Sequence, residues 1–233
     1  MNFVDTIDEA VFVRHALISL FDKRDLQILV EALVGLSPPA RIFSTGGTFT
    51  AIQSILGPRA GRNLIQVSEY TGQPEMQGGL VKTLDFKIYL GLLSESYNPA
   101  HQADLERVKA VPIDLVAVNL YPFLQIAARP EVNLEQARAN IDIGGPCMVR
   151  AAAKNFLRVA AVVDPADYGP LAEELRSSGG RISLATRFRL AQKAFACTAE
   201  YDRAIAGYLA GCSYAQVVSS YPRIHAGQCG GRP

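Results

Sequence analysis

Short apolar segments alternate with helix-like segments from the N-terminus to about residue 165. Apolar runs of this length, bounded by turn residues, are typical of buried strands, and their alternation with helices is typical of a parallel sheet covered by helices. The pattern therefore predicts an α/β fold. The expected strands are 15–20, 41–44, 63–67, 113–120 and 159–163.

Helical periodicity is found between these strands. Leu26, Leu29, Val30 and Leu33 recur at the spacing of one helix face, which predicts a helix over 25–36. The segment from 69 to 93 is loop-rich and too long for a simple connection, and loops of this kind often carry function. Further helices are expected over 48–56, 101–109, 134–141, 146–154 and 168–177.

The pattern changes after Ser183, where helix-forming residues continue without proline to about residue 210. One long helix or two consecutive helices are expected there. From Ser219 the chain is rich in Gly, Pro and Ser, which predicts poor order at its end. We therefore expect an α/β domain over 12–180, a C-terminal helical extension over 181–212 that packs on it, and a tail over 213–233.

Composition narrows the classes of function. The chain has 233 residues, 49% of them apolar, which is enough for a sizeable core. Lys and Arg number 23 against 22 Asp and Glu, so the chain lacks the basic excess of nucleic-acid-binding proteins. No apolar run approaches membrane-spanning length, and the acidic N-terminal residues do not resemble a signal peptide. We expect a cytoplasmic protein without nucleic-acid or membrane partners.

Cysteine and histidine are sparse. The four cysteines are widely separated, form no C-x-x-C pair and have no histidine at zinc-ligand spacing. The three histidines are isolated from one another. We therefore expect neither a metal site nor a disulfide framework, and any acid–base chemistry should use Lys, Tyr, Asp or Glu.

A glycine turn follows the second predicted strand. Ligands of parallel α/β sheets bind at the carboxyl ends of the strands, where loops lead into helices. The segment 44–48, Ser-Thr-Gly-Gly-Thr, lies at such a point, and its amides and hydroxyls could hold an anion such as a phosphate. The alternative is an ordinary glycine turn with Thr48 as the helix N-cap.

A second Gly-Gly turn, in segment 141–146, also precedes a predicted helix. Asp142 lies two residues before its first glycine and could orient or deprotonate an N–H group of a ligand, although capping the helix is the alternative. Lys154 lies further along the same helix. A place beside Asp142 would partly bury this lysine, and a solvated surface lysine is the alternative reading.

Two more pairs of polar residues stand out. Asn119 and Tyr121 end the strand predicted over 113–120, where an amide and a phenol are uncommon unless they form hydrogen bonds. Lys82 and Thr83 are the most reactive-looking pair of the loop-rich segment.

Taken together, these segments resemble, in order and spacing, the inosine monophosphate (IMP) cyclohydrolase domain of the bifunctional purine-biosynthesis enzyme that also carries an aminoimidazole carboxamide ribonucleotide transformylase. FACTAEYDRAIAGYLA (195–210) resembles the helix that closes this domain. The other matching runs are ALIS-x-x-DK (16–23), STGGT (44–48), VSEYTGQPEM (67–76), VKTL (81–84), VNLYPF (118–123), NIDIGGP (140–146) and MVRAAAKN (148–155).

The resemblance implies a methylglyoxal-synthase-like fold, a twisted parallel sheet flanked by helices. It implies ring closure of 5-formamido-imidazole-4-carboxamide ribonucleotide to IMP with loss of water. A purine ribonucleotide substrate, a homodimer and the absence of a metal or organic cofactor are also implied. The chain stops where the transformylase would begin, so we expect a standalone domain, with a separate transformylase as a possible partner.

The resemblance also implies roles for individual residues. Asp142 would orient or deprotonate the carboxamide, Lys82 and the N–H groups near Gly144 would stabilise the oxyanion, and Tyr121 or Lys154 would donate the proton that lets water leave. The 5′-phosphate would be held by Ser19, Lys23, Ser44, Gly46, Gly47 and Thr48. The residues implied to surround the base are Lys82, Thr83, Asn119, Tyr121, Asp142, Gly144, Gly145 and Lys154. Thr45 and Ile143 complete the implied substrate-binding set.

The chain departs from the family pattern at a few positions. The family reads S-V-S-D-K where this chain has Phe21 in place of the second hydroxyl, and it reads G-R-V-K-T-L-H-P where this chain has Leu80, Asp85 and Phe86. Retention of the four catalytic residues favours an active cyclohydrolase, whereas these departures favour a non-catalytic or altered purine-nucleotide-binding paralogue. A methylglyoxal-synthase-type lyase is a third reading, but the IDIGGP and RAAAKN elements do not belong to it.

Overall fold

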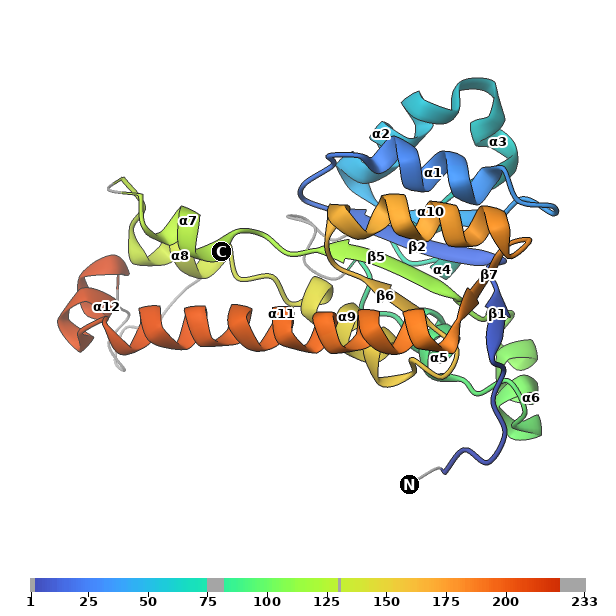
Figure 1. The fold of residues 1–233 in the computed structure, drawn as a ribbon. Coiled ribbons are helices and arrows are strands. Elements are labelled where there is room, and N and C mark those ends of the chain that lie inside the picture. Colours follow the sequence, from blue (N-terminus) through green and yellow to red (C-terminus); the bar gives the residue numbers. More distant parts are fainter. Residues whose placement is uncertain (1–2, 75–81, 130, 223–233) are drawn as a thin grey trace. The chain divides into compact units, whose positions relative to one another are not determined.

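The computed structural model describes residues 3–74, 82–129 and 131–222. The chain forms two compact units (Figure 1). Unit 1 comprises Met1–Leu120 and Ile143–Thr198, and unit 2 comprises Tyr121–Asp142 and Ala199–Pro233. The domain boundaries expected from the sequence, at residues 180 and 212, stay predictions.

Unit 1 is built on a five-stranded sheet in the order β4-β3-β2-β5-β6, and every neighbouring pair of strands is parallel. All five strands were predicted, and each lies within two residues of its expected bounds. The central strand, β2, hydrogen-bonds to β3 on one side and to β5 on the other. The strands are β2 (His15–Leu20), β3 (Arg41–Ser44), β4 (Leu64–Gln66), β5 (Leu115–Asn119) and β6 (Ala160–Val162).

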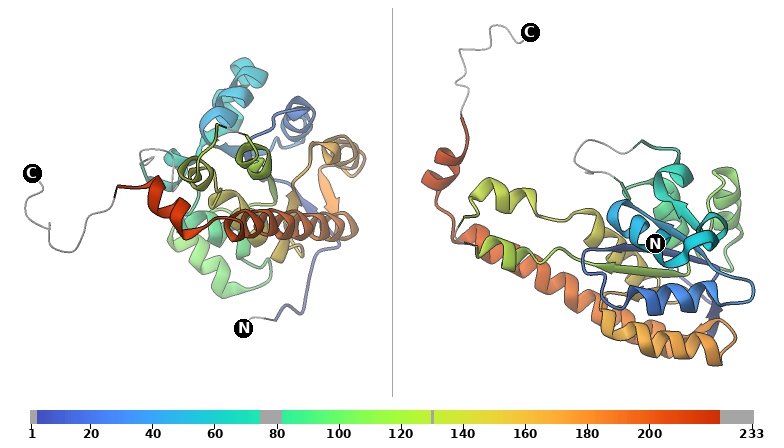
Figure 2. Two further views of the ribbon diagram at one scale, coloured as in Figure 1. Left: turned by 90° about the vertical axis from the view of Figure 1, so that its left-hand side faces the viewer. Right: turned by 90° about the horizontal axis from the view of Figure 1, so that it is seen from above.

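Helices cover both faces of this sheet. Side chains alternate along β2, so that Ala16, Ile18 and Leu20 enter one apolar core and Leu17 enters the other. The first core lies under α1 (Leu26–Val34), α2 (Gly46–Leu56) and α10 (Tyr168–Ser177), with α1 and α10 side by side (Figure 2). The second core lies under α5 (Phe86–Leu93) and α9 (Gly144–Lys154). Burial on both faces explains why the strands are apolar throughout.

Most of the predicted helices are confirmed within two residues. The region after Ser183 forms the single helix α11 (Leu184–Ala210), which runs from unit 1 into unit 2. Unit 1 also contains α6 (Pro99–Arg107) and the short helices η1 (Gly57–Arg59), α3 (Ala60–Asn63) and η3 (Pro165–Asp167).

Some elements were not predicted. β1 (Ala10–Phe12) and β7 (Arg181–Ser183) form a small antiparallel sheet, and three-residue strands are too short to show a periodicity. The segment expected to be loop-rich contains α4 (Val67–Thr71) and α5. Helix α5 forms because Ile88 and Leu92 bury its apolar side and Asp85 caps it, accepting a hydrogen bond from the N–H of Lys87 at 2.8 Å.

Unit 2 consists of α7 (Phe123–Ala127), α8 (Leu134–Ala139), α12 (Tyr214–Ser220) and the last part of α11. The ring of Phe123 packs edge-on against Tyr201 and Tyr208, at centroid distances of 6.4 and 5.5 Å. Helix α12 lies in the segment expected to be a tail, and a Ser213–Gln216 capping box begins it. The end of that tail, 223–233, lies outside the described residues.

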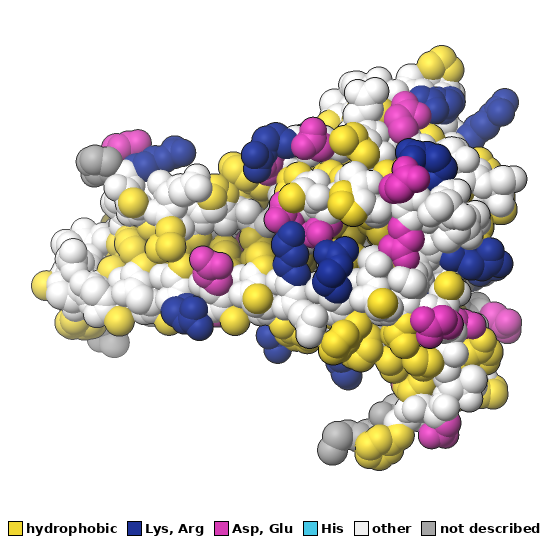
Figure 3. Space-filling model, in the orientation of Figure 1, with side chains coloured by type: hydrophobic (Ala, Val, Ile, Leu, Met, Phe, Trp, Pro, Cys, Tyr) yellow, Lys and Arg dark blue, Asp and Glu magenta, His cyan; other side chains and the backbone are white. Residues whose placement is uncertain are grey.

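Charges of both signs are intermixed on the surface of unit 1. Figure 3 shows Lys and Arg side chains among Asp and Glu over α1 and α10. Lys193 illustrates this, because its Nζ lies 2.7 Å from a carboxylate oxygen of both Asp164 and Asp167. In residues 3–74, 82–129 and 131–222, no helix combines the length and apolar character needed to cross a membrane. The same part of the chain holds no cluster of three or more His, Cys, Asp or Glu that could bind a metal ion.

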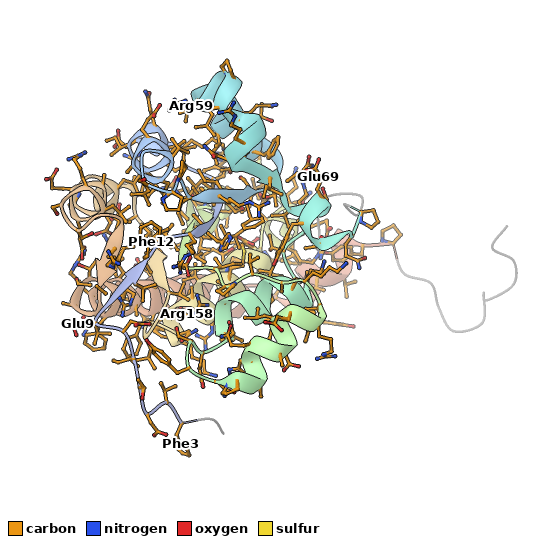
Figure 4. The ribbon with its side chains drawn as sticks, turned by 90° about the vertical axis from the view of Figure 1, so that its right-hand side faces the viewer. Phe3, Glu9, Phe12, Arg59, Glu69 and Arg158 are labelled. Carbon is orange, nitrogen blue, oxygen red and sulfur yellow. The ribbon has the colours of Figure 1, made fainter. Side chains whose placement is uncertain are left out.

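A buried arginine hydrogen-bonds to the C-terminal part of α5 and to the residues just before β5. Figure 4 shows Arg158 in the interior of unit 1, where it is 5% exposed and burial lowers its pKa. Its guanidinium donates to the Asp114 carboxylate at 3.0 Å and to the carbonyls of Gly91, Ser94 and Ile113. The N–H groups of Arg14 and His15 donate to the other oxygen of Asp114, so both carboxylate oxygens accept hydrogen bonds.

We expect Arg158→Met to lower the free energy of unfolding by about 3–5 kcal/mol, because it leaves the buried Asp114 carboxylate without its counter-charge and removes one hydrogen-bond donor from each of three carbonyls. Urea unfolding followed by circular dichroism measures this loss. Arg176→Met is the matched control, since Arg176 pairs with Glu173 at the surface, where ion pairs contribute little. Equal losses for the two variants would contradict a structural role for the buried pair.

Candidate functional site

The carboxyl ends of β2, β3 and β5 meet at one edge of the sheet of unit 1. The chain runs from β2 outward through β3 and β4 and then returns to the other side of β2 as β5. The point between β2 and β5 is therefore a topological switch point, where open α/β sheets bind their ligands. Ser19, Ser44 and Asn119, all predicted site residues, lie at these strand ends.

Side chains that follow β3 hold the end of β2. The Ser44 hydroxyl donates to the carbonyl of Ile18 at 2.7 Å. Thr48 binds both backbone groups of Leu20, since its hydroxyl accepts from the N–H at 2.9 Å and donates to the carbonyl at 3.0 Å. Thr48 therefore lies inside α2 and is not its N-cap, so that alternative reading of the glycine turn is wrong.

Helix α2 begins at the first glycine of the turn. Gly46 has a φ of +48°, in the left-handed region that favours glycine. Thr45 is the N-cap residue, and its side chain makes no hydrogen bond to the first N–H groups of the helix. This arrangement resembles the helix N-termini at which proteins bind anions.

Two lysines lie beside these glycines. A Cβ placed on Gly46 would lie 3.5 Å from Lys82 Nζ, and one placed on Gly47 would lie 4.0 Å from Lys23 Cε. Lys23 Nζ also donates to the carbonyls of Leu20 and Phe21, at 3.1 and 3.2 Å. The structure thus brings two cationic side chains to the N-terminal turn of α2.

The second Gly-Gly turn, at Gly144, lies next to Thr83, the residue after Lys82. A Cβ on Gly144 would lie 2.8 Å from the hydroxyl oxygen of Thr83, so only glycine fits there without displacement. Thr83 is buried, and so is Gly145. Ile143, which is 57% exposed, is the N-cap of α9 and provides no side-chain capping bond. Asp142 lies one residue before this N-cap.

Tyr121 and Asp142 belong to unit 2 and are the residues at which its first segment joins the chain of unit 1. Tyr121 is 47% exposed. The N–H of Asp142 donates to the hydroxyl of Tyr201 at 2.8 Å. Burial raises the pKa of Tyr201, and the Asp142 carboxylate adds to this shift. Sequence reasoning missed Tyr201, whose one signal was its place in the FACTAEYDRAIAGYLA segment.

Lys154 is the last residue of α9 and is exposed. Ten residues of helix separate it from Gly144, which corresponds to about 15 Å along the helix axis. The expected partial burial of Lys154 is therefore wrong, because its side chain lies at the solvated C-terminal end of the helix. Among the described residues around Lys82, the structure brings together Lys23, Gly46, Gly47, Thr83 and Gly144.

The departures from the family pattern have local structural roles. Phe21 is 48% exposed at the end of β2. Asp85 is the N-cap of α5, and Phe86, the first residue of that helix, is 62% exposed. Leu80 lies outside the described residues, as does the rest of 75–81.

Comparisons with known families and structures agree with this architecture. Residues 26–147 match the MGS-like domain, and residues 152–228 match the AICARFT/IMPCHase bienzyme family. A solved structure entitled "Crystal structure of ForH" superimposes with a TM-score of 0.70 and 30% identity, over 84% of this chain and 99% of that chain. The predicted methylglyoxal-synthase-like α/β fold is thereby confirmed.

Two curated relatives carry the name bifunctional purine biosynthesis protein PurH. The protein from Neisseria meningitidis is 46% identical over 212 residues, which is 91% of this chain. The protein from Chlorobium phaeovibrioides is 44% identical over 208 residues, which is 89% of this chain. In both cases the alignment spans 38% of the relative's length. The chain thus belongs to the MGS-like domain family, and its C-terminal part matches the AICARFT/IMPCHase bienzyme family.

Proposed function

We propose that this chain is an IMP cyclohydrolase, which closes the ring of 5-formamido-imidazole-4-carboxamide ribonucleotide to IMP with loss of water. The observation that carries the proposal is the pair of lysines, Lys23 and Lys82, at the N-terminal glycines of α2, beside the switch point of the sheet. The relatives named as purine biosynthesis proteins support a purine nucleotide as the substrate.

The N-terminal turn of α2 is the proposed site of the 5′-phosphate. The N–H groups of Gly46 and Gly47 and the helix dipole favour an anion there, and a lysine ammonium adds charge-assisted hydrogen bonds. Lys23 Nζ uses two of its three hydrogens on loop carbonyls, so one is left to donate to a phosphate oxygen.

The proposed chemistry takes place on the base. The carboxamide nitrogen attacks the formyl carbon, a C–N bond forms, and the nitrogen gives its proton to Asp142. The formyl oxygen becomes an oxyanion, stabilised by Lys82 and by the first N–H groups of α9. It takes up two protons, its bond to the former formyl carbon breaks, and it leaves as water. The nitrogen of the former formamide loses its proton as the C=N bond of the ring forms, so two N–H protons balance the two on the water. Asp142 returns one of these protons and Tyr121 supplies the other, which the formamide nitrogen restores to it. Both reacting groups belong to one molecule, so the protein mainly holds them in attack geometry.

An altered purine-nucleotide-binding paralogue is the second candidate function. The exposed aromatic rings of Phe21 and Phe86, which stand where the family has other residues, favour it. An absorbance assay that follows IMP formation by the purified protein separates the two candidates, because a paralogue without turnover would bind IMP and form none.

We also propose that the protein acts in the cytoplasm as a homodimer. Helix α11 carries several large apolar side chains. Leu190 and Tyr201 are buried, whereas Phe188, Phe195 and Leu209 are 47%, 40% and 47% exposed. Exposed aromatic side chains of this kind are common at subunit interfaces.

For the dimer, we expect light scattering to give a mass near twice the 25.2 kDa of the chain. Phe188→Glu together with Phe195→Glu should shift the mass toward that of one chain, because carboxylates resist burial in an interface. A monomeric wild-type protein at micromolar concentrations would contradict the proposal.

For ligand binding, we expect calorimetry to detect binding of IMP and no binding of inosine under the same conditions. The nucleoside lacks the phosphate that the α2 turn and Lys23 would hold by charge-assisted hydrogen bonds. Equal affinities for the two ligands would show that the phosphate is not recognised.

For catalysis, we expect Lys82→Ala to lower turnover by about a hundredfold or more, the scale of one lost oxyanion donor, and to leave IMP affinity within a few-fold. Lys87→Ala is the control, because it removes a lysine that has no proposed role in the site and whose Nζ donates to the Tyr70 carbonyl at 3.2 Å. Since Lys82 Nζ also lies beside Gly46, loss of IMP affinity at unchanged turnover would instead assign Lys82 to the phosphate.

A further inference from the structure

One side chain at the end of β5 holds the loop that connects β2 to α1. Asn119 Oδ1 accepts hydrogen bonds from the N–H groups of Phe21 at 2.7 Å and Asp22 at 3.0 Å, and its Nδ2 donates to the Asp22 carbonyl at 2.7 Å. Two backbone donors converge on one atom of the amide, so that atom must be the oxygen. The orientation of the amide is thereby fixed.

These bonds limit what else Asn119 can do. Both lone pairs of Oδ1 are used, and one of the two Nδ2 hydrogens is used. A single N–H hydrogen is left for a ligand, and no acceptor is left. Asn119 is therefore primarily bound to the backbone of the loop, whereas the resemblance placed it at the base of the substrate.

The loop that Asn119 holds is largely exposed. Phe21 is 48% exposed, and the Asp22 carboxylate pairs at 2.6 Å with the exposed side chain of Arg24, a type of ion pair that contributes little. Hydrogen bonds from Arg24 lower the pKa of Asp22. Asp25, which ends the loop, has a φ of +57° and makes no side-chain capping bond to α1. The three bonds from Asn119 to the backbone of Phe21 and Asp22 are therefore direct restraints on the loop.

Lys23 connects this loop to the proposed phosphate site. It follows Asp22 directly, its ammonium donates to the carbonyls of Leu20 and Phe21, and its stem passes the N-terminal turn of α2 at Gly47. A loop released from Asn119 would move the backbone of Lys23 and the Phe21 carbonyl, while the Leu20 carbonyl would stay bound to Thr48.

We propose that Asn119 is a positioning residue, which clamps the β2–α1 loop and thereby sets Lys23 over the N-terminus of α2. Asn119 thus affects the affinity for a ligand through contacts to its phosphate and not through contacts to its base. The inference rests on the proposed function for the identity of the nucleotide, but the clamp itself concerns this chain alone.

The test compares Asn119→Ala with Asn98→Ala. Asn98 is a matched control, because its side-chain oxygen also accepts from two backbone N–H groups, those of Ala100 and His101, at the start of α6. Calorimetric titrations with IMP and with inorganic phosphate report on the two parts of the ligand. Amide hydrogen exchange by NMR reports on the loop without any ligand.

We expect Asn119→Ala to weaken the binding of IMP and of inorganic phosphate by the same factor, about tenfold. Asn98→Ala should change neither affinity. The amides of Phe21 and Asp22 should exchange at least about tenfold faster in Asn119→Ala, whereas Asn98→Ala should speed only those of Ala100 and His101. In a Lys23→Ala background, Asn119→Ala should cause no further loss of phosphate binding, because the two residues act in series.

Weaker IMP binding with unchanged phosphate binding would mean that Asn119 contacts the base, and the proposal would be overturned. Unchanged exchange at Phe21 and Asp22 would also overturn it. A wild-type protein that binds phosphate but not IMP would refute the proposed function alone, since the phosphate and exchange measurements would still decide the role of Asn119. If it binds neither ligand, exchange at Phe21 and Asp22 still decides the clamp, and the link to the phosphate site is refuted.

Discussion

The site depends on the hydrogen bonds made by the backbone at the end of β2, beyond the last residues that pair with β3 and β5. The ladder with β3 ends at the pair Ile18–Ser44, and the ladder with β5 ends at Leu20–Asn119. Buried backbone groups beyond these points still need partners. The Thr48 hydroxyl serves Leu20 on the β3 side, and the Asn119 amide serves the next two residues on the β5 side. Side chains thus extend a backbone ladder by two residues, and this extension fixes where the β2–α1 loop begins.

This arrangement also determines where glycine is needed. Because Thr48 must reach β2 from the first turn of α2, the chain has to turn sharply after β3, and Gly46 adopts the left-handed conformation there. Lys82 Nζ lies against Gly46, and the hydroxyl of the next residue, Thr83, lies against Gly144 at the start of α9. One short segment therefore touches both Gly-Gly turns. A side chain at Gly144 would push this segment away, so the glycine is required by close packing and not by backbone conformation.

The sequence was sufficient for the sheet and less so for the site. Strands such as 15–20 and 41–44 were predictable because burial on both faces leaves a continuous apolar run. Helix α5 was missed because its signal, the Asp85 cap, is a local hydrogen bond inside a segment without an obvious periodicity. The predicted groups around Lys82 follow from strand order, since strand ends in a parallel sheet share an edge. The hydroxyl of Tyr201 on the N–H of Asp142 and the exposure of Lys154 depend on tertiary packing, and no spacing in the sequence encodes them.

The same hydrogen bonds bear on the choice between an active enzyme and an altered paralogue. Phe21 stands in place of a family hydroxyl, but Asn119 binds the main-chain N–H of Phe21, which every residue except proline supplies. The exposed ring leaves this bond intact. Asp85, which stands in place of the family's histidine, caps α5 by accepting a hydrogen bond from the N–H of Lys87. The backbone bonds at both positions are thus made despite the departures, and the retained Lys23 and Lys82 at α2 favour the active enzyme over the altered paralogue.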